Sequence, residues 1–171
     1  MKCMKVFDSL KALEKTKEFI DWRTNNKEYY LVSLFYISDK PNEIQIDYYN
    51  SKKNTITSFN YSKNSVFVVK DSQVMSKTKK ELKPLVLEGI SEFDNALETA
   101  LSYKKEKHSK EEIYKTIIIL QNDDTITKEG RIIWNIIFIT NSFKVINYKL
   151  DAKNLELLSQ NINSIFSFIQ K

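Results

Sequence analysis

The sequence predicts an α+β fold made of two tandem units, in each of which one helix packs on an antiparallel sheet, with a short helix at the C-terminus. Three observations favour it. An amphipathic segment begins near Asp8 and another near Ser91, and each precedes short β-rich segments separated by turn residues. We therefore expect a duplication, with 1–76 as the first unit and 77–171 as the second. The alternative is two unrelated α+β stretches.

The first helix is predicted from a capping signal and an apolar stripe. Asp8 or Ser9 can accept a hydrogen bond from a free backbone N–H at the helix start. Leu10, Leu13 and Ile20 then recur at helical spacing, with charged residues between them. The sequence Thr-Asn-Asn ends the pattern, so one helix of about four turns is expected here.

Four strands are predicted after this helix. Their residues are β-branched or aromatic, or alternate between apolar and polar, and turn residues such as Pro41 separate them. The expected strands are 28–38, 43–50, 55–61 and 65–70.

The second helix is predicted to begin after Ser91, with Asp94 as a variant of the capping box. Four further strands are expected after it, and 131–140 is apolar at both odd and even positions, which is typical of a central strand covered on both faces. A short terminal helix is indicated by the spacing of its apolar residues. These elements are the strands 113–121, 131–140, 143–150 and 155–159 and a helix over 162–169.

Residues 90–160 resemble a known family. The segment ISEFDNALETALSY looks like the opening helix of PepSY-like domains, and the later RIIWNIIFITNSFKVINYKLDAKNLELLSQN is similar to their Trp-bearing strand and hairpin. The family's turn reads Asp-Ala-x-x-Gly, whereas here the glycine is missing and Asn154 could supply a left-handed conformation instead. The resemblance implies a cystatin-like architecture. It also implies binding or protease inhibition, in a family that is generally extracytoplasmic.

The sequence shows no segment suited to a membrane or to export. No apolar run reaches the roughly 18 residues of a membrane helix, because Asn135 interrupts the longest candidate, 132–140. The N-terminus lacks the continuous apolar core of a secretory signal. We therefore expect a cytoplasmic protein with no membrane contact.

Catalytic and cofactor-binding patterns are absent from the sequence. His108 is the single histidine and lies in a charged run, and Cys3 is the single cysteine, so a nucleophile–base pair would require a chance approach of the two. The only glycines, Gly89 and Gly130, are too few for a phosphate-binding loop. The sequence therefore predicts a protein that is not an enzyme and has no cofactor.

One loop could in principle hold a divalent ion. Asp123, Asp124 and Glu129 are close in sequence, and carboxylates are suitable ligands for such ions. A hydrophilic hairpin loop without metal is the favoured interpretation, so no metal site is predicted.

The charge pattern leaves a nucleic-acid partner open. The net charge is +5, but 25 of the 27 basic residues are lysines, and arginine is the better reader of bases. The densest cationic run lies near the middle of the chain, where exposed aromatic residues could stack on bases. The run consists of Lys77, Lys79, Lys80 and Lys83, and the aromatic candidates are Tyr49, Tyr61 and Phe67.

Taken together, these patterns predict a non-enzymatic binding or assembly module that binds a protein partner or associates with itself. The ground for this is the abundance of predicted sheet, whose edges are available for pairing, beside a lack of catalytic groups. The alternative is a basic nucleic-acid-binding protein that uses its first half, because 1–85 carry 16 basic and 10 acidic residues.

Overall fold

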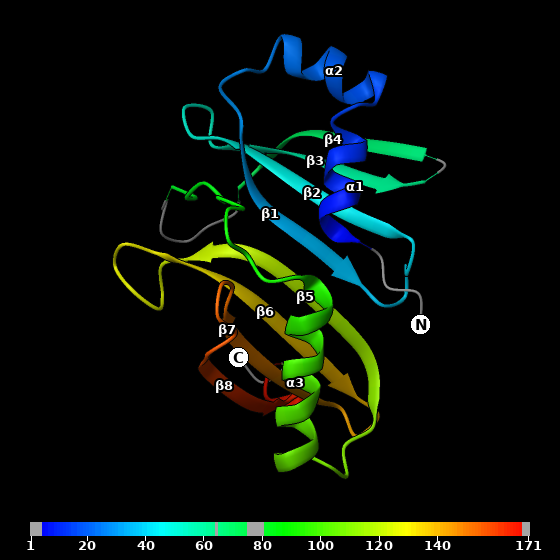
Figure 1. Cartoon of the computed structure of the whole chain (residues 1–171), viewed down its shortest axis with the longest axis vertical. Helices are drawn as coiled ribbons and strands as arrows, with labels where there is room; N and C mark the ends of the chain where they lie inside the picture. The colour runs from blue at the N-terminus through cyan, green and yellow to red at the C-terminus, as the bar shows by residue number, and fades with distance from the viewer. Residues whose placement is uncertain (1–4, 64, 75–80, 169–171) are drawn as a thin grey trace.

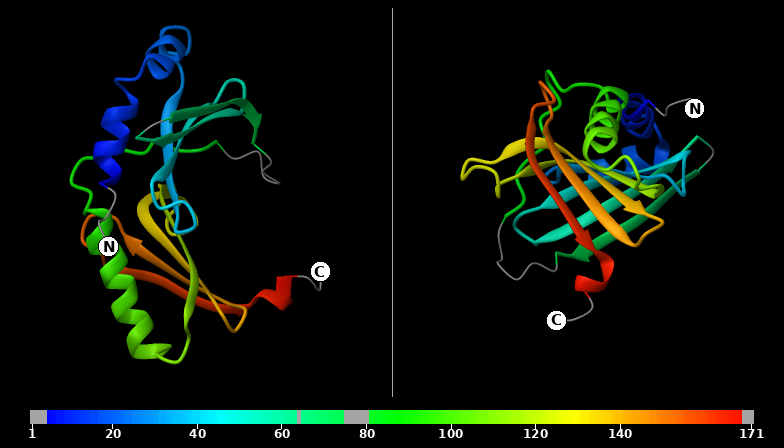
Figure 2. Two further views of the ribbon diagram at one scale, coloured as in Figure 1. Left: turned by 90° about the vertical axis from the view of Figure 1, so that its right-hand side faces the viewer. Right: turned by 90° about the horizontal axis from the view of Figure 1, so that it is seen from below.

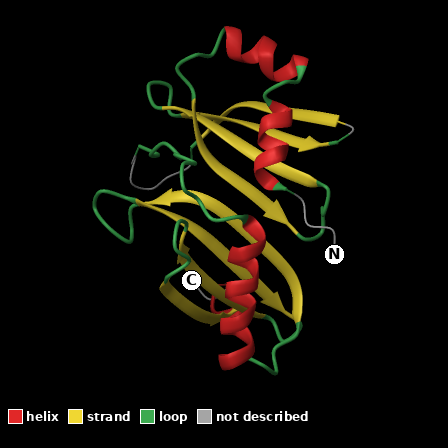
Figure 3. Cartoon of the chain, viewed as in Figure 1, coloured by secondary structure: helices red, strands yellow, loops and turns green. Residues whose placement is uncertain are grey.

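The computed structural model describes residues 5–63, 65–74 and 81–168 of the 171-residue chain. Within them the protein has three α-helices, eight strands and a final 3-10 turn, which confirms the predicted α+β composition (Figures 1 and 3). The helices are α1 (Val6–Leu13), α2 (Lys17–Thr24) and α3 (Phe93–Lys107).

All eight described strands belong to one antiparallel sheet, in the order β4-β3-β2-β1-β5-β6-β7-β8. Strands that follow one another in sequence are paired, except β4 and β5, and β1 pairs with β5 instead. The strands are β1 (Tyr30–Ile37), β2 (Glu43–Asn50), β3 (Thr55–Ser62), β4 (Ser65–Gln73), β5 (Ile113–Asp123), β6 (Arg131–Thr140), β7 (Lys144–Asp151) and β8 (Leu157–Ser164).

The prediction of two tandem helix-on-sheet units is wrong, because the sheet is continuous through the β1–β5 pair. Leu34 of β1 lies opposite Leu120 of β5, and five consecutive residue pairs extend from Ser33 to Ile37. Neither strand is therefore an edge. Both strands are rich in large apolar residues, and pairing them removes two hydrogen-bonding edges from water. The expected boundary between 76 and 77 lies outside the described residues.

The three helices cover one face of the sheet, and the other face carries no described helix. Figure 2 shows the sheet strongly bent, with the helices outside the bend. The core lies between the helices and the outer face, where Trp22 and Trp134 are buried together with apolar residues of the helices. The helix-free face is nevertheless crowded by its own side chains, since Ile133 is fully buried there. The expectation that 131–140 is covered on both faces is thus correct for burial but not for helix cover.

The single long N-terminal helix that was expected is two helices. The first ends at Leu13, and Thr16 begins the second by accepting a hydrogen bond from the Phe19 N–H through its hydroxyl, at 3.3 Å. The break turns the chain so that both apolar stripes reach the sheet. The expected caps at Asp8 or Ser9 are also wrong, because the helix starts earlier and Lys5 occupies its N-cap without a side-chain bond.

Ser91 fixes the approach to α3 without capping it. The N-cap is Glu92 and makes no side-chain bond, whereas the Ser91 hydroxyl donates to the Lys153 carbonyl at 2.7 Å. The Ser91 N–H donates to the Ala152 carbonyl, which attaches the start of α3 to the turn after β7.

The expected C-terminal helix is a single 3-10 turn, Ile165–Phe168, and the last expected residue, Ile169, lies outside the described part. Strand β8 is correspondingly longer than the predicted 155–159. Its residues pair with β7 as far as Ser164, so backbone pairing takes the segment that the apolar spacing assigned to a helix.

Candidate binding site

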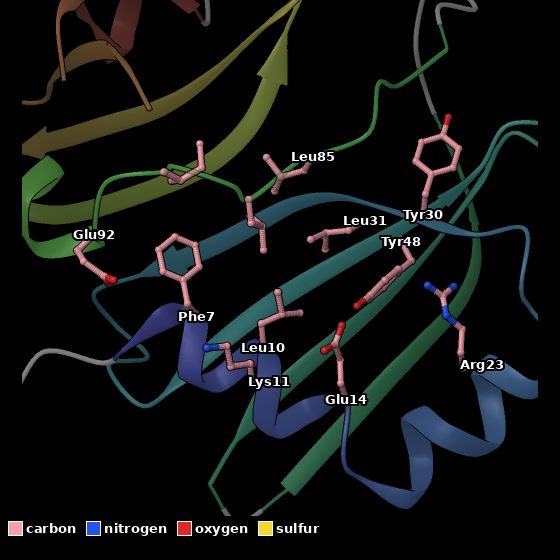
Figure 4. A pocket seen from close by; sticks show the side chains of 12 residues that line it. Phe7, Leu10, Lys11, Glu14, Arg23, Tyr30, Leu31, Tyr48, Leu85 and Glu92 are labelled. Atoms are coloured by element: carbon pink, nitrogen blue, oxygen red, sulfur yellow. The ribbon is translucent and has the colours of Figure 1, made fainter. Parts of the chain in front are cut away.

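A groove with a volume of about 670 Å³ lies between α1, the start of β1, the end of β2 and the segment that leads to α3. We call it the α1 groove. Figure 4 shows apolar side chains along its length, with Glu92 near one end and Arg23 near the other. Its lining comprises Phe7, Leu10, Lys11, Glu14, Arg23, Tyr30, Leu31, Tyr48, Leu85, Leu87, Ile90 and Glu92.

The wall opposite α1 is held in place by bonds to β1. The Leu85 N–H donates to the Leu31 carbonyl at 2.8 Å, and the Tyr30 hydroxyl donates to the Leu82 carbonyl at 2.7 Å. Leu85 is buried, whereas Leu87 is half-buried and faces the groove. The groove is therefore bounded by fixed backbone on both sides, as in most preformed ligand sites.

Arg23 lies over three aromatic rings at one end of the groove. Its guanidinium carbon is 5.8 Å from the ring centre of Phe19, 5.6 Å from that of Trp22 and 5.3 Å from that of Tyr48. Cation–π contacts of this kind stabilise a guanidinium where water is partly excluded. The charge therefore has a fixed position in the groove.

The guanidinium retains capacity for a ligand. One terminal nitrogen, Nη1, donates to the carbonyls of Asn26 (3.3 Å) and Tyr29 (2.7 Å). Among the described residues no carboxylate lies within 4.0 Å of Arg23. An arginine has five N–H donors in a planar fork that fits a carboxylate. The α1 groove thus offers apolar side chains and a guanidinium that makes no ion pair with a described residue.

Two tyrosines of the groove hold their protons more strongly than usual. Burial, and then the negative charge of Glu14, raise the pKa of Tyr48 well above the ordinary tyrosine range, while the positive charge of Arg23 opposes the shift. Burial, and then the charge of Glu81, raise the pKa of Tyr30 to about 12. Both hydroxyls are therefore neutral hydrogen-bonding groups at physiological pH.

The raised pKa of Tyr30 predicts a loss of stability in alkali. Unfolded tyrosine ionises near pH 10, at about its model value, whereas folded Tyr30 keeps its proton to about pH 12. In that window the folded state binds more protons than the unfolded state, so the free energy of unfolding falls as pH rises. Urea unfolding between about pH 9 and about pH 12 measures the slope. Tyr30→Phe should reduce it, and an unchanged slope in that variant would contradict the assignment.

The structure describes only one of the four lysines in the predicted cationic run. Lys77, Lys79 and Lys80 lie outside the described residues, and Lys83 donates to the Lys128 carbonyl at 3.1 Å. Of the aromatic candidates for stacking, Phe67 is 65% exposed, Tyr61 is half-buried and Tyr49 is buried. A nucleic-acid contact by this run stays a prediction.

The weaker candidates are not brought together in the described residues. Asp123 accepts hydrogen bonds from Lys149 (2.6 Å) and from the Thr125 hydroxyl (2.6 Å), and no group of three metal-ligating side chains is found in the described part of the chain. His108 lies at the end of α3, with its ring nitrogen Nε2 3.1 Å from the Gln160 amide nitrogen. Cys3 lies outside the described residues.

Sequence reasoning missed Arg23 and the groove around it. The one signal that could have pointed there is rarity, because Arg23 and Arg131 are the only arginines in a lysine-rich chain. Arg131 is paired with Asp151 (2.6 Å), whereas Arg23 is not ion-paired among the described residues. Distinguishing the two required the tertiary structure.

The comparisons with known proteins identify a similar fold. No protein-family model matches the chain, and no curated protein matches it. The structure is similar to the crystal structure of a protein from Clostridium difficile 630 described as a "putative lipoprotein", with a TM-score of 0.54 and 16% sequence identity. The match covers 85% of this chain and 90% of that one. At this identity the likeness concerns the fold alone. Among the described residues no helix has the length and apolar character needed to cross a bilayer.

Proposed function

We propose that this protein is a non-enzymatic binding module and that the α1 groove holds its ligand, a largely apolar molecule or segment that carries a carboxylate. The observation that carries the proposal is the guanidinium of Arg23, which has no carboxylate within 4.0 Å among the described residues and lies at one end of a groove of about 670 Å³. Volumes of this order accommodate small-molecule ligands. The apolar walls would bury the body of the ligand, and Arg23 would fix its orientation.

The charges around the groove favour one orientation. Arg23 and Glu92 lie at opposite ends in Figure 4, with Phe7, Leu10 and Leu31 between them. A ligand carboxylate would bind at Arg23, at the opposite end from Glu92. The charge of Glu14, which also acts on Tyr48, opposes this contact, so the gain depends on the hydrogen bonds from Arg23. A charge-assisted hydrogen bond of this kind contributes about 1.5–3 kcal/mol, which corresponds to roughly tenfold or more in affinity.

The proposal is tested with dodecanoate, which combines an apolar chain and a carboxylate, by displacement of the fluorescent probe anilinonaphthalene sulfonate. Dodecanoate is expected to bind the wild-type chain in a one-to-one ratio. Arg23→Gln should weaken this binding at least tenfold, because the amide keeps little of the donor fork and none of the charge.

A second pair of variants keeps the test independent of the structural contacts of Arg23. Leu87→Glu places a negative charge inside the groove and should abolish dodecanoate binding. Val86→Glu makes the same change at the preceding residue, which is 58% exposed and outside the groove lining, and should have no effect. Equal binding by Leu87→Glu and Val86→Glu would contradict the proposed site.

Self-association is the second part of the proposal, and it is supported by β4, which lies at one edge of the described sheet. Phe67 is 65% exposed and Val69 is 39% exposed on this strand, and exposed apolar edges favour strand addition. Light scattering should give a mass of at least twice the 20.2 kDa of one chain. A monomeric mass at every protein concentration would contradict the proposed self-association. The nucleic-acid alternative would instead predict retention on heparin that weakens steeply with salt.

A further inference from the structure

The helix-free face of the sheet holds a carboxylate that has no cation beside it in the described part of the chain. Asp47 of β2 points to this face, because its neighbours Ile46 and Tyr48 belong to the core under the helices. Asp47 is only 8% exposed. Among the described residues no Lys, Arg or His nitrogen lies within 4.0 Å of it. Buried charges in proteins are ordinarily paired, because desolvation of an isolated charge is costly.

The hydrogen bonds to Asp47 leave one acceptor position unfilled. Its Oδ1 accepts from the Gln45 amide (2.9 Å) and the Ser58 hydroxyl (2.6 Å), and its Oδ2 accepts from the Ser33 hydroxyl (2.6 Å). A carboxylate has about four lone-pair positions. All three donors are neutral, so the negative charge is oriented but not compensated, and Oδ2 can accept a further bond.

A second, independent acceptor on the same face also lacks a donor. Asn135 of β6 is 9% exposed, and its Oδ1 has no hydrogen-bond partner among the described residues. The Oδ1 atom of Asn147 on β7 likewise has no hydrogen-bond partner among the described residues. Buried polar atoms without partners are rare, because each one costs free energy. Lys149 lies opposite Asn135 in the register, but its ammonium is bound to Asp123 at 2.6 Å.

Apolar side chains separate the two acceptors. The register places Gln45, Phe35, Ile119 and Asn135 in one row across β2, β1, β5 and β6, and Asp47 lies in the adjacent row. Phe35 and Ile119 are half-buried on this face. Three strand spacings of about 4.8 Å and an offset of two residues, about 6.8 Å, put the two acceptors about 16 Å apart along the sheet.

We propose that the helix-free face binds a linear polyamine, with one ammonium group at Asp47 and a second nitrogen at the side-chain carbonyl of Asn135. An ammonium group supplies three N–H donors and the charge that Asp47 lacks. The methylene chain of the ligand lies over Phe35 and Ile119. The net charge of the chain is +5, so attraction of polyamines to the protein as a whole does not account for binding, and a local site is required.

Isothermal titration of the full chain with spermine tests the proposal. One spermine per chain is expected, and Asp47→Asn should weaken its binding at least tenfold. Asp94→Asn removes the same charge from the exposed surface of α3 and should change the affinity less than twofold. Asn135→Leu should weaken spermine binding, but not that of putrescine, which is too short to span both acceptors.

A measurement on the unaltered chain keeps the proposal falsifiable if Asp47→Asn does not fold. Spermine should raise the melting temperature more than tetramethylammonium does at the same concentration of positive charge, because tetramethylammonium has no N–H donor. Absence of spermine binding, equal stabilisation by the two cations, or equal spermine affinity in Asp47→Asn would each overturn the proposal. Arg23→Gln should leave spermine binding unchanged, which separates this site from the α1 groove.

Discussion

Replacement of Trp134 by alanine is expected to lower the free energy of unfolding by about 3–5 kcal/mol. Trp134 is 1% exposed and lies between the rings of Phe7 and Phe93, with ring-centre distances of 6.3 and 6.1 Å. Its indole N–H also donates to the Ser91 carbonyl at 3.2 Å. The alanine variant therefore creates a cavity between α1, α3 and the sheet and removes a donor from the start of α3.

Thermal and urea unfolding measure this loss. The melting temperature should fall by roughly 10 °C, since each 1 kcal/mol corresponds to about 2–4 °C in a chain of this size. Tyr114→Ala, at a residue that is 72% exposed, is the control and should change the free energy of unfolding by less than about 0.5 kcal/mol. A loss below about 1 kcal/mol in Trp134→Ala would contradict the packing described for this residue.

Replacement of Leu120 by alanine is expected to cost about 2–5 kcal/mol, because the residue is fully buried where the two halves of the sheet join. Leu120 of β5 lies between Leu34 of β1 and Trp134 of β6 in the register. Removing its side chain weakens the packing on both sides of the junction.

The same substitution at an exposed residue provides the control. Leu101 on α3 is 38% exposed, so Leu101→Ala should cost clearly less than Leu120→Ala in urea unfolding. Equal losses in the two variants would show that the β1–β5 junction contributes no special stability.

The elements that the sequence predicted best are those with strong local patterns. Strands β2 and β6 have the predicted bounds, 43–50 and 131–140. In the first, side chains alternate with a period of two. In the second, an apolar run interrupted by Asn135 is bounded by turns. Both signals depend only on neighbouring residues, so no tertiary information is needed.

The errors arise where tertiary contacts override the local pattern. The expected stripe placed Leu13 and Ile20 on one helix face, but the chain breaks between α1 and α2. Ile20 is 52% exposed, and Phe19 and Trp22 are the residues that α2 buries. The spacing of apolar residues after 160 favours a helix, but pairing with β7 makes this segment a strand as far as Ser164. Local preference is a weak guide in such segments, because burial and backbone pairing contribute more.

The continuity of the sheet and the candidate sites could not be predicted from spacing. Leu34 and Leu120 are 86 positions apart in sequence, and no short-range signal specifies that they are paired. Arg23 is distinguished by the three rings over which it lies, and Asp47 by the lack of a cation within 4.0 Å among the residues that the structure describes. Both properties depend on which residues the β1–β5 pairing and the helix packing bring together.

The central structural claim is that the described sheet is a single folding unit, and the two tryptophans test it directly. Trp22 reports on the first half of the chain and Trp134 on the second, and each is buried. Trp22→Phe and Trp134→Phe leave one reporter each. In each variant, urea unfolding would be followed by fluorescence and by far-ultraviolet circular dichroism.

We predict one transition in each variant, with the same midpoint by both probes, because the β1–β5 pairing couples the halves. Two separated transitions, or a fluorescence midpoint that differs from the circular dichroism midpoint, would contradict the claim that the sheet unfolds as one cooperative unit. That result would instead favour independent halves divided near residue 76.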